Sequence, residues 1–322
     1  MASLPSEVAK SLNETKVEYR LLGNSGLRVS VPIVGCMSIG NPEWANWDRG
    51  VNTDTANIYS NGDSESIITQ AIKKYHLPRQ KLVLMTKAWS CLRQTKDYVS
   101  QFDLSRSALF TAVNNSLERL ETDYIDVFWI HRFDPYTPIK ETMRALHDLT
   151  TAGKIRFIGA SSMWTYQFAI MQFCAEKNGW TKYVAMQNHY SILYREEERE
   201  MNKFCEATGV AIVPWGPLAE GKFACSVKAQ GTTSRSAGTV ETLRPESVNI
   251  INRVEELAKR KDWTMSQVTL AWTQKRVTSP IIGFSSVDRI DEALSARGKE
   301  LTSEEEAYLE EPYTPLEVEG HF

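Results

Sequence analysis

The chain has 322 residues and a mass of 36.5 kDa, with 42% hydrophobic residues, 24% charged residues and a net charge of −3. This balance is typical of a globular protein and argues against nucleic acid or an anionic membrane as a partner. No segment approaches the ~18 consecutive apolar residues of a membrane span. The polar first 18 residues resemble neither a secretory signal nor a transit peptide, so we expect a cytoplasmic protein.

Cysteine and histidine usage predicts no disulfide framework and no metal site. The cysteine count is odd and no Cys-x-x-Cys occurs, which favours reduced buried thiols. The histidines show no ligand spacing. The residues concerned are Cys36, Cys91, Cys174, Cys205 and Cys225, and His76, His131, His147, His189 and His321.

The N-terminal region predicts a polar tail over residues 1–16, followed by one domain over residues 17–322. Tyr19 to Ser30 contains Gly23-Asn24-Ser25-Gly26 between two short extended pieces, which is typical of a β-hairpin. We expect this hairpin to plug the N-terminal end of a barrel.

Eight short apolar runs alternate with helix-period segments along the rest of the chain. The runs are apolar on both faces, as expected of buried parallel strands. This alternation predicts an α/β fold, a (β/α)₈ TIM barrel. One helix carries Leu109, Val113, Leu117 and Leu120, with Asp103 as its expected N-cap. The predicted strands are 31–36, 51–54, 82–87, 125–131, 155–160, 183–187, 210–215 and 280–283, and further helices are expected at 64–74, 139–152, 166–177, 196–207, 248–261 and 266–275.

The first crossover of this barrel is short. Residues 37–40 follow the first strand, and only the ten residues 41–50 then lead to the second strand. A parallel crossover normally needs at least ~10–12 residues including its helix, although ten extended residues can span ~33 Å. We therefore expect the return to be possible without a full first helix.

Four reactive side chains fall where predicted strands end: Asp54, Tyr59, Lys87 and His131. Such ends meet at one mouth of a parallel barrel. A carbonyl reduced by hydride needs a proton, and a nearby ammonium lowers the pKa of a phenol, so Lys87, held by Asp54, would tune Tyr59 as the donor. His131 would orient the carbonyl oxygen. Taken singly, each has an ordinary role in a turn, in packing or at the surface; the joint placement favours catalysis.

At these residues the chain resembles the aldo-keto reductases, through Asp54-Thr55-Ala56-Asn57-Ile58-Tyr59, Lys87 and His131-Arg132. The resemblance runs from Tyr19 to about Pro315. It is nearest to fungal members similar to aryl-alcohol dehydrogenases and to the versiconal hemiacetal acetate reductase type, which often serve secondary metabolism. It implies a carbonyl reductase that binds NADP(H) without a Rossmann motif, and no Gly-x-Gly-x-x-Gly follows a strand here.

The resemblance also implies residues that hold the cofactor. Ser161, Ser162 and Gln187 would bind the carboxamide, Trp215 would stack on the nicotinamide, and Asp54 is a further expected cofactor contact. Arg289 suits the 2′-phosphate because its planar fork matches phosphate oxygens. Other roles remain open: helix N-caps for the serines, structure for Gln187, core for Trp215 and surface for Arg289. The remaining predicted contacts are Gly216, Pro217, Leu218, Ala219, Gly221, Lys222 and Phe223 for the pyrophosphate, Gly283 and Ser285 for the adenosine phosphate, and Glu292 for the adenine.

Three departures from the family pattern favour a second hypothesis. The first helix is missing, and the usual aromatic residue between Thr53 and Asp54 is absent, which would change the side to which Asp54 points. Glu220 also places an acid beside the expected pyrophosphate. The chain would then be a degenerate NADP(H)-binding or regulatory member with impaired catalysis. A phosphate-handling isomerase barrel is a third possibility.

The substrate is expected to be a small carbonyl or alcohol compound, aromatic or polyketide-like. Specificity would come from the loops 88–103 and 215–242 and from the tail 316–322. Within the second of these loops, residues 231–238 are expected to be mobile. Trp44, Trp89 and Trp129 point to an aromatic ligand, although each also suits packing.

Overall fold

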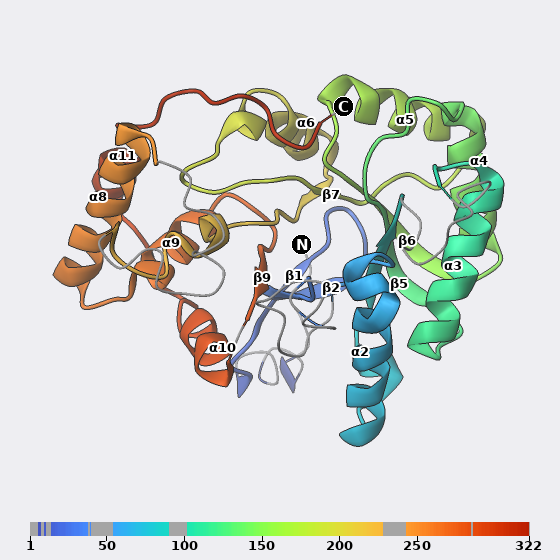
Figure 1. The fold of residues 1–322 in the computed structure, drawn as a ribbon, viewed down its shortest axis with the longest axis horizontal. Coiled ribbons are helices and arrows are strands. Elements are labelled where there is room, and N and C mark those ends of the chain that lie inside the picture. The colour runs from blue at the N-terminus through green and yellow to red at the C-terminus, as the bar shows by residue number, and fades with distance from the viewer. Residues whose placement is uncertain are drawn as a thin grey trace.

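Short parallel strands surround a central core, and helices cover them from outside, in the computed structural model of the chain (Figure 1). The structure describes residues 6–7, 10, 14–37, 39, 54–89, 102–227, 243–284 and 286–321. The boundary between a tail over residues 1–16 and a barrel domain over 17–322 stays a prediction.

The strands close into a ring. Five of them form one parallel sheet, β4 to β8 in chain order, and β3 pairs in parallel with β9. Asp54 bridges Gly35 of β3 and Met85 of β4, and Ile281 N of β9 donates to Pro214 O beyond β8 at 2.8 Å. The predicted (β/α)₈ barrel is confirmed, with Asp54 alone marking the second strand in the described ranges. The bounds are β3 Ile33–Gly35, β4 Met85–Ala88, β5 Ile125–Ile130, β6 Ile155–Ser161, β7 Ala185–Gln187, β8 Ala211–Ile212 and β9 Ile281–Gly283.

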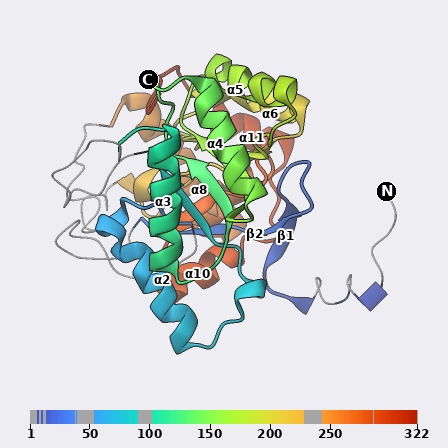
Figure 2. The ribbon, with the colours of Figure 1, turned by 90° about the vertical axis from the view of Figure 1, so that its right-hand side faces the viewer.

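Amphipathic helices follow the strands as the sequence pattern predicts. Figure 2 looks onto α2, α3 and α4, which run side by side on the outer surface. The bounds are α2 Asp63–Lys74, α3 Arg106–Leu120, α4 Ile139–Thr151, α5 Thr165–Asn178, α6 Met201–Thr208, α8 Pro245–Lys261, α9 Met265–Gln274, α10 Val287–Leu294 and α11 Ser303–Glu310, with single 3₁₀ turns η1 Tyr59–Gly62, η2 Arg79–Lys81, η3 Glu196–Glu198 and η4 Ala219–Gly221.

The expected N-cap of α3 is wrong by two residues. Ser105 caps the helix, since its Oγ accepts from Ala108 N at 3.3 Å and its backbone is extended. Asp103 has φ 104°, outside the extended range of an N-cap, and its carboxylate instead accepts from Ser105 N at 2.7 Å. The acid therefore holds the capping residue rather than the helix.

The predicted hairpin is present as β1 Glu18–Leu21 and β2 Arg28–Val31. Its turn contacts the segment before β8, because Asn24 N donates to Gly209 O at 2.8 Å. Gly23 has φ +59°, and a Cβ there would lie 2.6 Å from Gly209 O. At the other side, Ser279 Oγ donates to Ser30 O at 2.7 Å. These contacts precede β8 and β9, so the hairpin covers the N-terminal end of the barrel.

Trp129 fills the barrel interior rather than facing a ligand. It is fully buried beside Leu22 and Val29 of the hairpin region. A Cβ on Gly159 of the neighbouring strand would lie 2.3 Å from Cε3 of Trp129, so the indole fits only because residue 159 has no side chain. Packing is therefore the correct interpretation of Trp129. Trp44, the crossover 41–50, the loop 231–238 and Cys91 lie outside the described residues.

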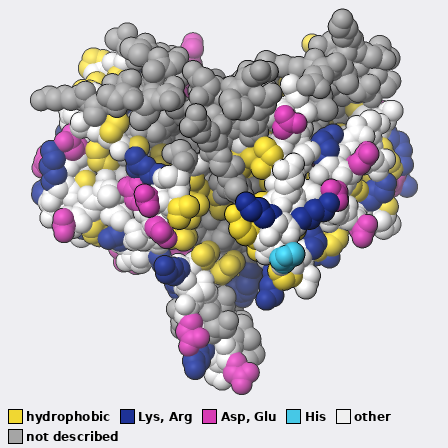
Figure 3. All heavy atoms as spheres, turned by 60° about the horizontal axis from the view of Figure 1, so that its bottom comes forward, with side chains coloured by type: hydrophobic (Ala, Val, Ile, Leu, Met, Phe, Trp, Pro, Cys, Tyr) yellow, Lys and Arg dark blue, Asp and Glu magenta, His cyan; other side chains and the backbone are white. Residues whose placement is uncertain are grey.

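The outer surface carries mixed charge. On the face drawn in Figure 3, Lys and Arg side chains are interspersed with Asp and Glu over the described atoms. None of the helices in the described ranges has the length and apolar character needed to cross a bilayer. In the same ranges, no group of three or more His, Cys, Asp or Glu side chains is arranged to hold a metal ion.

Candidate active site

The four predicted strand-end residues converge at the C-terminal mouth of the barrel. Lys87 Nζ donates to Asp54 Oδ2 at 2.7 Å, to Thr55 O at 3.0 Å and to Tyr59 Oη at 3.5 Å. The Tyr59 and His131 rings meet edge to face, with centroids 5.9 Å apart. The acid, the ammonium, the phenol and the imidazole thus lie together at the mouth of the barrel.

Backbone pairing directs Asp54 toward Lys87. Asp54 N donates to Val34 O at 2.7 Å, Cys36 N donates to Asp54 O at 2.8 Å, and Thr55 N donates to Met85 O at 2.9 Å. Asp54 therefore lies in register between β3 and β4, and its buried side chain reaches the ammonium. The missing aromatic residue before Asp54 has not turned the carboxylate away from the site.

A strained turn places Tyr59. Ser60 and Asn61 have φ of 48° and 56°, and Gly62 has φ 94°, so three consecutive residues adopt the left-handed region. Such conformations cost about 1–3 kcal/mol each for residues with a side chain and often occur at functional sites. Ser64 at the start of α2 donates to Cys36 O at 3.2 Å and contacts the Thr55 hydroxyl at 2.7 Å, which joins the turn to the first two strands.

The Asp54–Lys87 pair is buried on both sides, with side chains 3% and 1% exposed. Burial lowers the pKa of Lys87, but the Asp54 and Tyr59 charges raise it more, so the net pKa lies above its usual value. Burial raises the pKa of Asp54, and Lys87 and Gln187 counteract only part of this effect. Lys87 is therefore a fixed cation at neutral pH.

The expected lowering of the Tyr59 pKa is wrong. Burial raises the pKa of Tyr59, and the opposing charge of Lys87 does not fully compensate. Lys87 acts as predicted, but desolvation outweighs it. The phenol consequently keeps its proton throughout the neutral range.

His131 is neutral at physiological pH. Burial lowers its pKa well below the usual range, and the Lys87 and Arg132 charges lower it further. A neutral imidazole carries one N–H and can donate one hydrogen bond to an oxygen. Such a donor is what the predicted role of orienting a carbonyl oxygen requires.

Polar residues at the ends of β6 and β7 form a connected group beside Asp54. Ser161 Oγ donates to Gln187 O at 2.7 Å, and Gln187 Nε2 approaches Asp54 Oδ1 at 3.3 Å. Ser162 N donates to the side chain of Asn188 at 2.7 Å. The serines are not helix caps, because α5 begins at Thr165 with Trp164 as its N-cap. Sequence reasoning missed Asn188, whose position directly after Gln187 was the available signal.

Trp215 has one face covered by a second ring. His189 stacks on it with centroids 4.2 Å apart and 6° between the planes, and Tyr194 stacks behind His189 at 4.4 Å. Trp215 Nε1 donates to Ser162 Oγ at 3.3 Å, and the indole is half-buried. Gly216 has φ +71°, and a Cβ there would lie 3.0 Å from His189. Trp215 is thus a partly exposed ring at the mouth, with one face covered by His189, rather than a core residue.

The predicted phosphate-binding residues lie in two groups. Residues 216–223 form the turn around η4, where Glu220 is exposed with φ 58°. In α10, Arg289 is paired with Glu292 at 2.8 Å, so a bound phosphate has to compete with this acid. Gly283 ends β9, and Ser285 lies outside the described residues.

The C-terminal segment crosses from α11 toward α5 and α6 (Figure 1) and reaches the mouth. His189 Nδ1 donates to Glu319 Oε2 at 3.1 Å, and Glu319 N donates to Tyr194 Oη at 2.9 Å. This hydrogen bond from His189 helps to lower the pKa of Glu319. Tail residue 319 therefore holds the two rings that support Trp215, a role with no local sequence signal.

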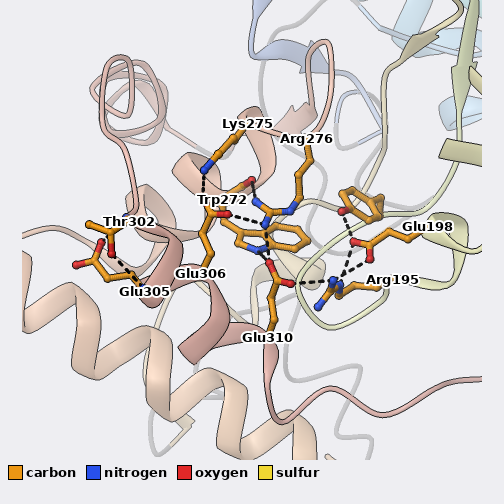
Figure 4. A network of polar contacts seen from close by, with 10 residues as sticks. Arg195, Glu198, Trp272, Lys275, Arg276, Thr302, Glu305, Glu306 and Glu310 are labelled. Carbon is orange, nitrogen blue, oxygen red and sulfur yellow. Dashed lines mark hydrogen bonds and ion pairs between the residues drawn. The ribbon is translucent and has the colours of Figure 1, made fainter. Parts of the chain in front are cut away.

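A network of ion pairs fixes the origin of this tail (Figure 4). Glu310, at the end of α11, accepts from Trp272 Nε1 at 2.8 Å and pairs with Arg276 and Arg195. Arg195 also pairs with Glu198 at 2.8 Å. Helices α9 and α11 are thereby joined to the η3 turn next to the mouth.

Comparisons with known proteins all point to one family. The aldo/keto reductase family profile matches residues 45–313. An aldo-keto reductase of Fusarium vanettenii is 50% identical over 358 aligned positions, covering 99% of this chain and 97% of the relative. Versiconal hemiacetal acetate reductase of Aspergillus parasiticus is 42% identical, covering 94% and 98%. A crystal structure of a thermostable aldo-keto reductase with the inhibitor epalrestat has a TM-score of 0.71 and 26% identity, covering 91% and 99%.

The alignment with the Fusarium relative is longer than the 322 residues of this chain, so that relative contains residues without a counterpart here. Even so, the profile and the relatives span nearly the whole sequence. The protein belongs to the aldo/keto reductase family and is an oxidoreductase acting on the CH–OH/C=O pair.

Proposed function

We propose that the protein is an NADPH-dependent reductase of an aldehyde or ketone, reversible as an alcohol dehydrogenase. The convergence of Asp54, Tyr59, Lys87 and His131 carries this proposal. When bound, NADPH supplies the hydride that adds to the carbonyl carbon, and NADP⁺ is the oxidised product. The chain supplies the proton that completes the alcohol.

Each of the four residues has a distinct role in this proposal. Tyr59 gives its phenolic proton to the carbonyl oxygen, and Lys87 stabilises the phenolate that remains. Asp54 keeps Lys87 charged and oriented through the 2.7 Å contact. Neutral His131 donates a hydrogen bond to the carbonyl oxygen and sets its angle.

The residues beside this group suit a nicotinamide cofactor. Trp215 offers a flat, half-buried face already supported from behind by His189, which fits a planar ring. Ser161, Ser162 and Gln187 would hold the carboxamide. Residues 216–223 would hold the pyrophosphate, Gly283, Ser285 and Arg289 would hold the adenosine phosphate, and Glu292 would face the adenine. A cytoplasmic location and an aromatic or polyketide-like substrate in fungal secondary metabolism complete the proposal.

Replacement of Tyr59 tests the role of the phenol. Tyr59→Phe is expected to reduce turnover of a generic aromatic aldehyde by about 10²–10⁴-fold, the usual contribution of a positioned acid. NADPH affinity, measured by fluorescence titration, should stay within about twofold. Tyr75→Phe, on the surface after α2, is the matched control. Turnover retained in Tyr59→Phe would exclude the mechanism.

The second candidate is a degenerate member that binds NADP(H) without efficient turnover. The short first crossover and the missing residues relative to the Fusarium protein motivate it. The geometry of the four residues supports the catalytic proposal instead. Tight NADPH binding with no turnover of any aldehyde tested would favour the degenerate member.

A further inference from the structure

Arg132 directs a guanidinium toward the mouth of the barrel. It follows His131 at the carboxyl end of β5, and its Nη1 donates to His131 O at 2.9 Å. A Cβ placed on Gly320 of the tail would lie 3.8 Å from Arg132 Nη2 and 3.8 Å from Ser162 Oγ. The guanidinium therefore lies between the end of β5, the end of β6 and the C-terminal tail.

This guanidinium has no counter-ion in the described part of the chain. Its bond to His131 O is the one hydrogen bond that it makes there, although an arginine has five N–H donors. The acid nearest in sequence, Asp134, is occupied, because its two oxygens accept from Leu104 N at 2.8 Å and Tyr136 N at 2.9 Å. Among the described residues, no carboxylate is one of the groups whose charge shifts the pKa of Arg132.

Leaving a half-buried cation unpaired is unfavourable for the protein alone. Burial lowers the pKa of Arg132, and only the nearby Tyr59 phenol acts in the opposite direction. A cation removed from water gains most from an anion that can accept two parallel N–H bonds. The arrangement thus favours an anionic ligand between Arg132 and Tyr59.

The barrel topology separates this ligand from the cofactor phosphates. The proposed phosphate residues follow β8 and β9, whereas Arg132 follows β5. Around the ring, β6 and β7 lie between β5 and β8, and β4, Asp54 and β3 lie between β5 and β9. Arg132 is therefore across the mouth from the phosphates, on the side of Tyr59 and His131, where the carbonyl substrate reacts.

We propose that Arg132 is a specificity-determining residue that binds a carboxylate of the substrate, so that the preferred substrates are oxo acids. The inference rests on the proposed carbonyl reduction and adds a substrate class to it. Arg132 forms a forked pair with the carboxylate while Tyr59 and His131 contact the carbonyl oxygen. Reduction converts the oxo acid to a hydroxy acid, with one hydride from NADPH and one proton from Tyr59.

A substrate pair that differs only in charge tests this assignment. Phenylglyoxylate and its methyl ester carry the same reactive ketone and ring. Wild type should show a kcat/KM at least about tenfold higher for the acid, and Arg132→Gln should lower this value by about 10- to 100-fold, the range for a hydrogen-bonded charge pair. The ester should change by less than about threefold. Arg132→Lys should have a kcat/KM for the acid between those of wild type and Arg132→Gln, because lysine supplies the positive charge but not the two parallel N–H donors of arginine.

Two controls make the comparison specific. Arg144→Gln on the exposed face of α4 removes a surface cation paired with Asp148 and should leave both substrates unaffected. NADPH affinity should be unchanged in Arg132→Gln. Equal losses for the acid and the ester, or weakened NADPH binding, would overturn the assignment.

Direct binding separates failure of this inference from failure of the proposed reduction. Mandelate, the hydroxy acid product of phenylglyoxylate, should bind the wild-type protein by calorimetry and bind Arg132→Gln at least about tenfold more weakly. If the wild-type protein reduces no carbonyl but binds mandelate more tightly than Arg132→Gln does, the anion site is supported and the proposed reduction is wrong. If wild type reduces the ester as well as the acid and binds no mandelate, the reaction stands and the anion site falls.

Discussion

Lys87 Nζ lies 2.7 Å from Asp54 Oδ2 and 3.5 Å from Tyr59 Oη, so a single buried ammonium is shared by an acid and a phenol. These three residues come from three consecutive segments of the barrel. Because the ammonium is the common partner, its removal affects stability and chemistry together.

Lys87→Met is expected to destabilise the protein by about 3–5 kcal/mol, because it leaves the Asp54 carboxylate buried without its cation. The double variant Asp54→Asn/Lys87→Met should recover much of this loss, since no unpaired charge remains. Urea denaturation at neutral pH measures both. Lys73→Met removes a surface ion pair to Glu121 and should cost less than about 1 kcal/mol. A similar small loss for Lys87→Met would contradict the prediction.

The pH profile of carbonyl reduction should be flat between about pH 6 and about pH 9. The raised pKa of Tyr59 keeps the proton donor protonated as the pH rises. The lowered pKa of His131 keeps the imidazole uncharged near neutral pH, so protonation of His131 does not change the rate there. Alcohol oxidation needs the phenolate and should therefore accelerate as pH increases. Initial rates in both directions over this range check the signs. An acid limb near pH 6.5 that disappears in His131→Asn would show that the histidine is charged in the free enzyme.

Gly159→Ala should destabilise the barrel by about 1–3 kcal/mol, because the new methyl group meets the buried Trp129 ring. Gly26→Ala is the matched control, since a Cβ there meets nothing within 4 Å. Thermal unfolding compares the two variants. Equal stability of both would mean that the indole can move within the core.

Glu319→Ala should weaken NADPH binding by about two- to fivefold, because His189 loses its acceptor and the rings behind Trp215 become less fixed. The effect is small since the carboxylate is 59% exposed. Glu319→Gln keeps an acceptor and should bind normally, as should Glu317→Ala in the exposed tail. Fluorescence titration gives the affinities. Loss of aldehyde affinity without loss of NADPH affinity would place Glu319 at the substrate instead.

Sequence reasoning reached the barrel and the four-residue group because their signals are local. Apolar runs mark strands, and the residues after them must meet at the mouth. The same reasoning placed the N-cap of α3 at Asp103, because a capping preference alone does not specify backbone geometry. Ser105 has the extended backbone, with ψ 159°, that an N-cap requires.

Features that depend on distant partners were not accessible from the sequence. The support of Trp215 joins residues 189, 194 and 319, and the isolation of Arg132 depends on Asp134 being occupied elsewhere. The direction in which the pKa of Tyr59 shifts likewise depends on how deeply its ring is buried. Burial raises this pKa by more than Lys87 lowers it. The sequence pattern identifies which residue types lie at the strand ends, whereas the burial of their side chains in the folded protein sets their charge states.

The hairpin at the base of the barrel has a consequence for folding order. Arg20 Nη1 donates to Gln274 O, 254 residues later, and Ser279 Oγ donates to Ser30 O, 249 residues earlier. During synthesis the hairpin leaves the ribosome well before these partners, which follow it by 254 and 249 residues. Loop closure over such separations is slow, and an unpaired two-stranded edge invites association with other chains. The hairpin must therefore wait until the residues between α9 and β9 are made before its docking contacts can form.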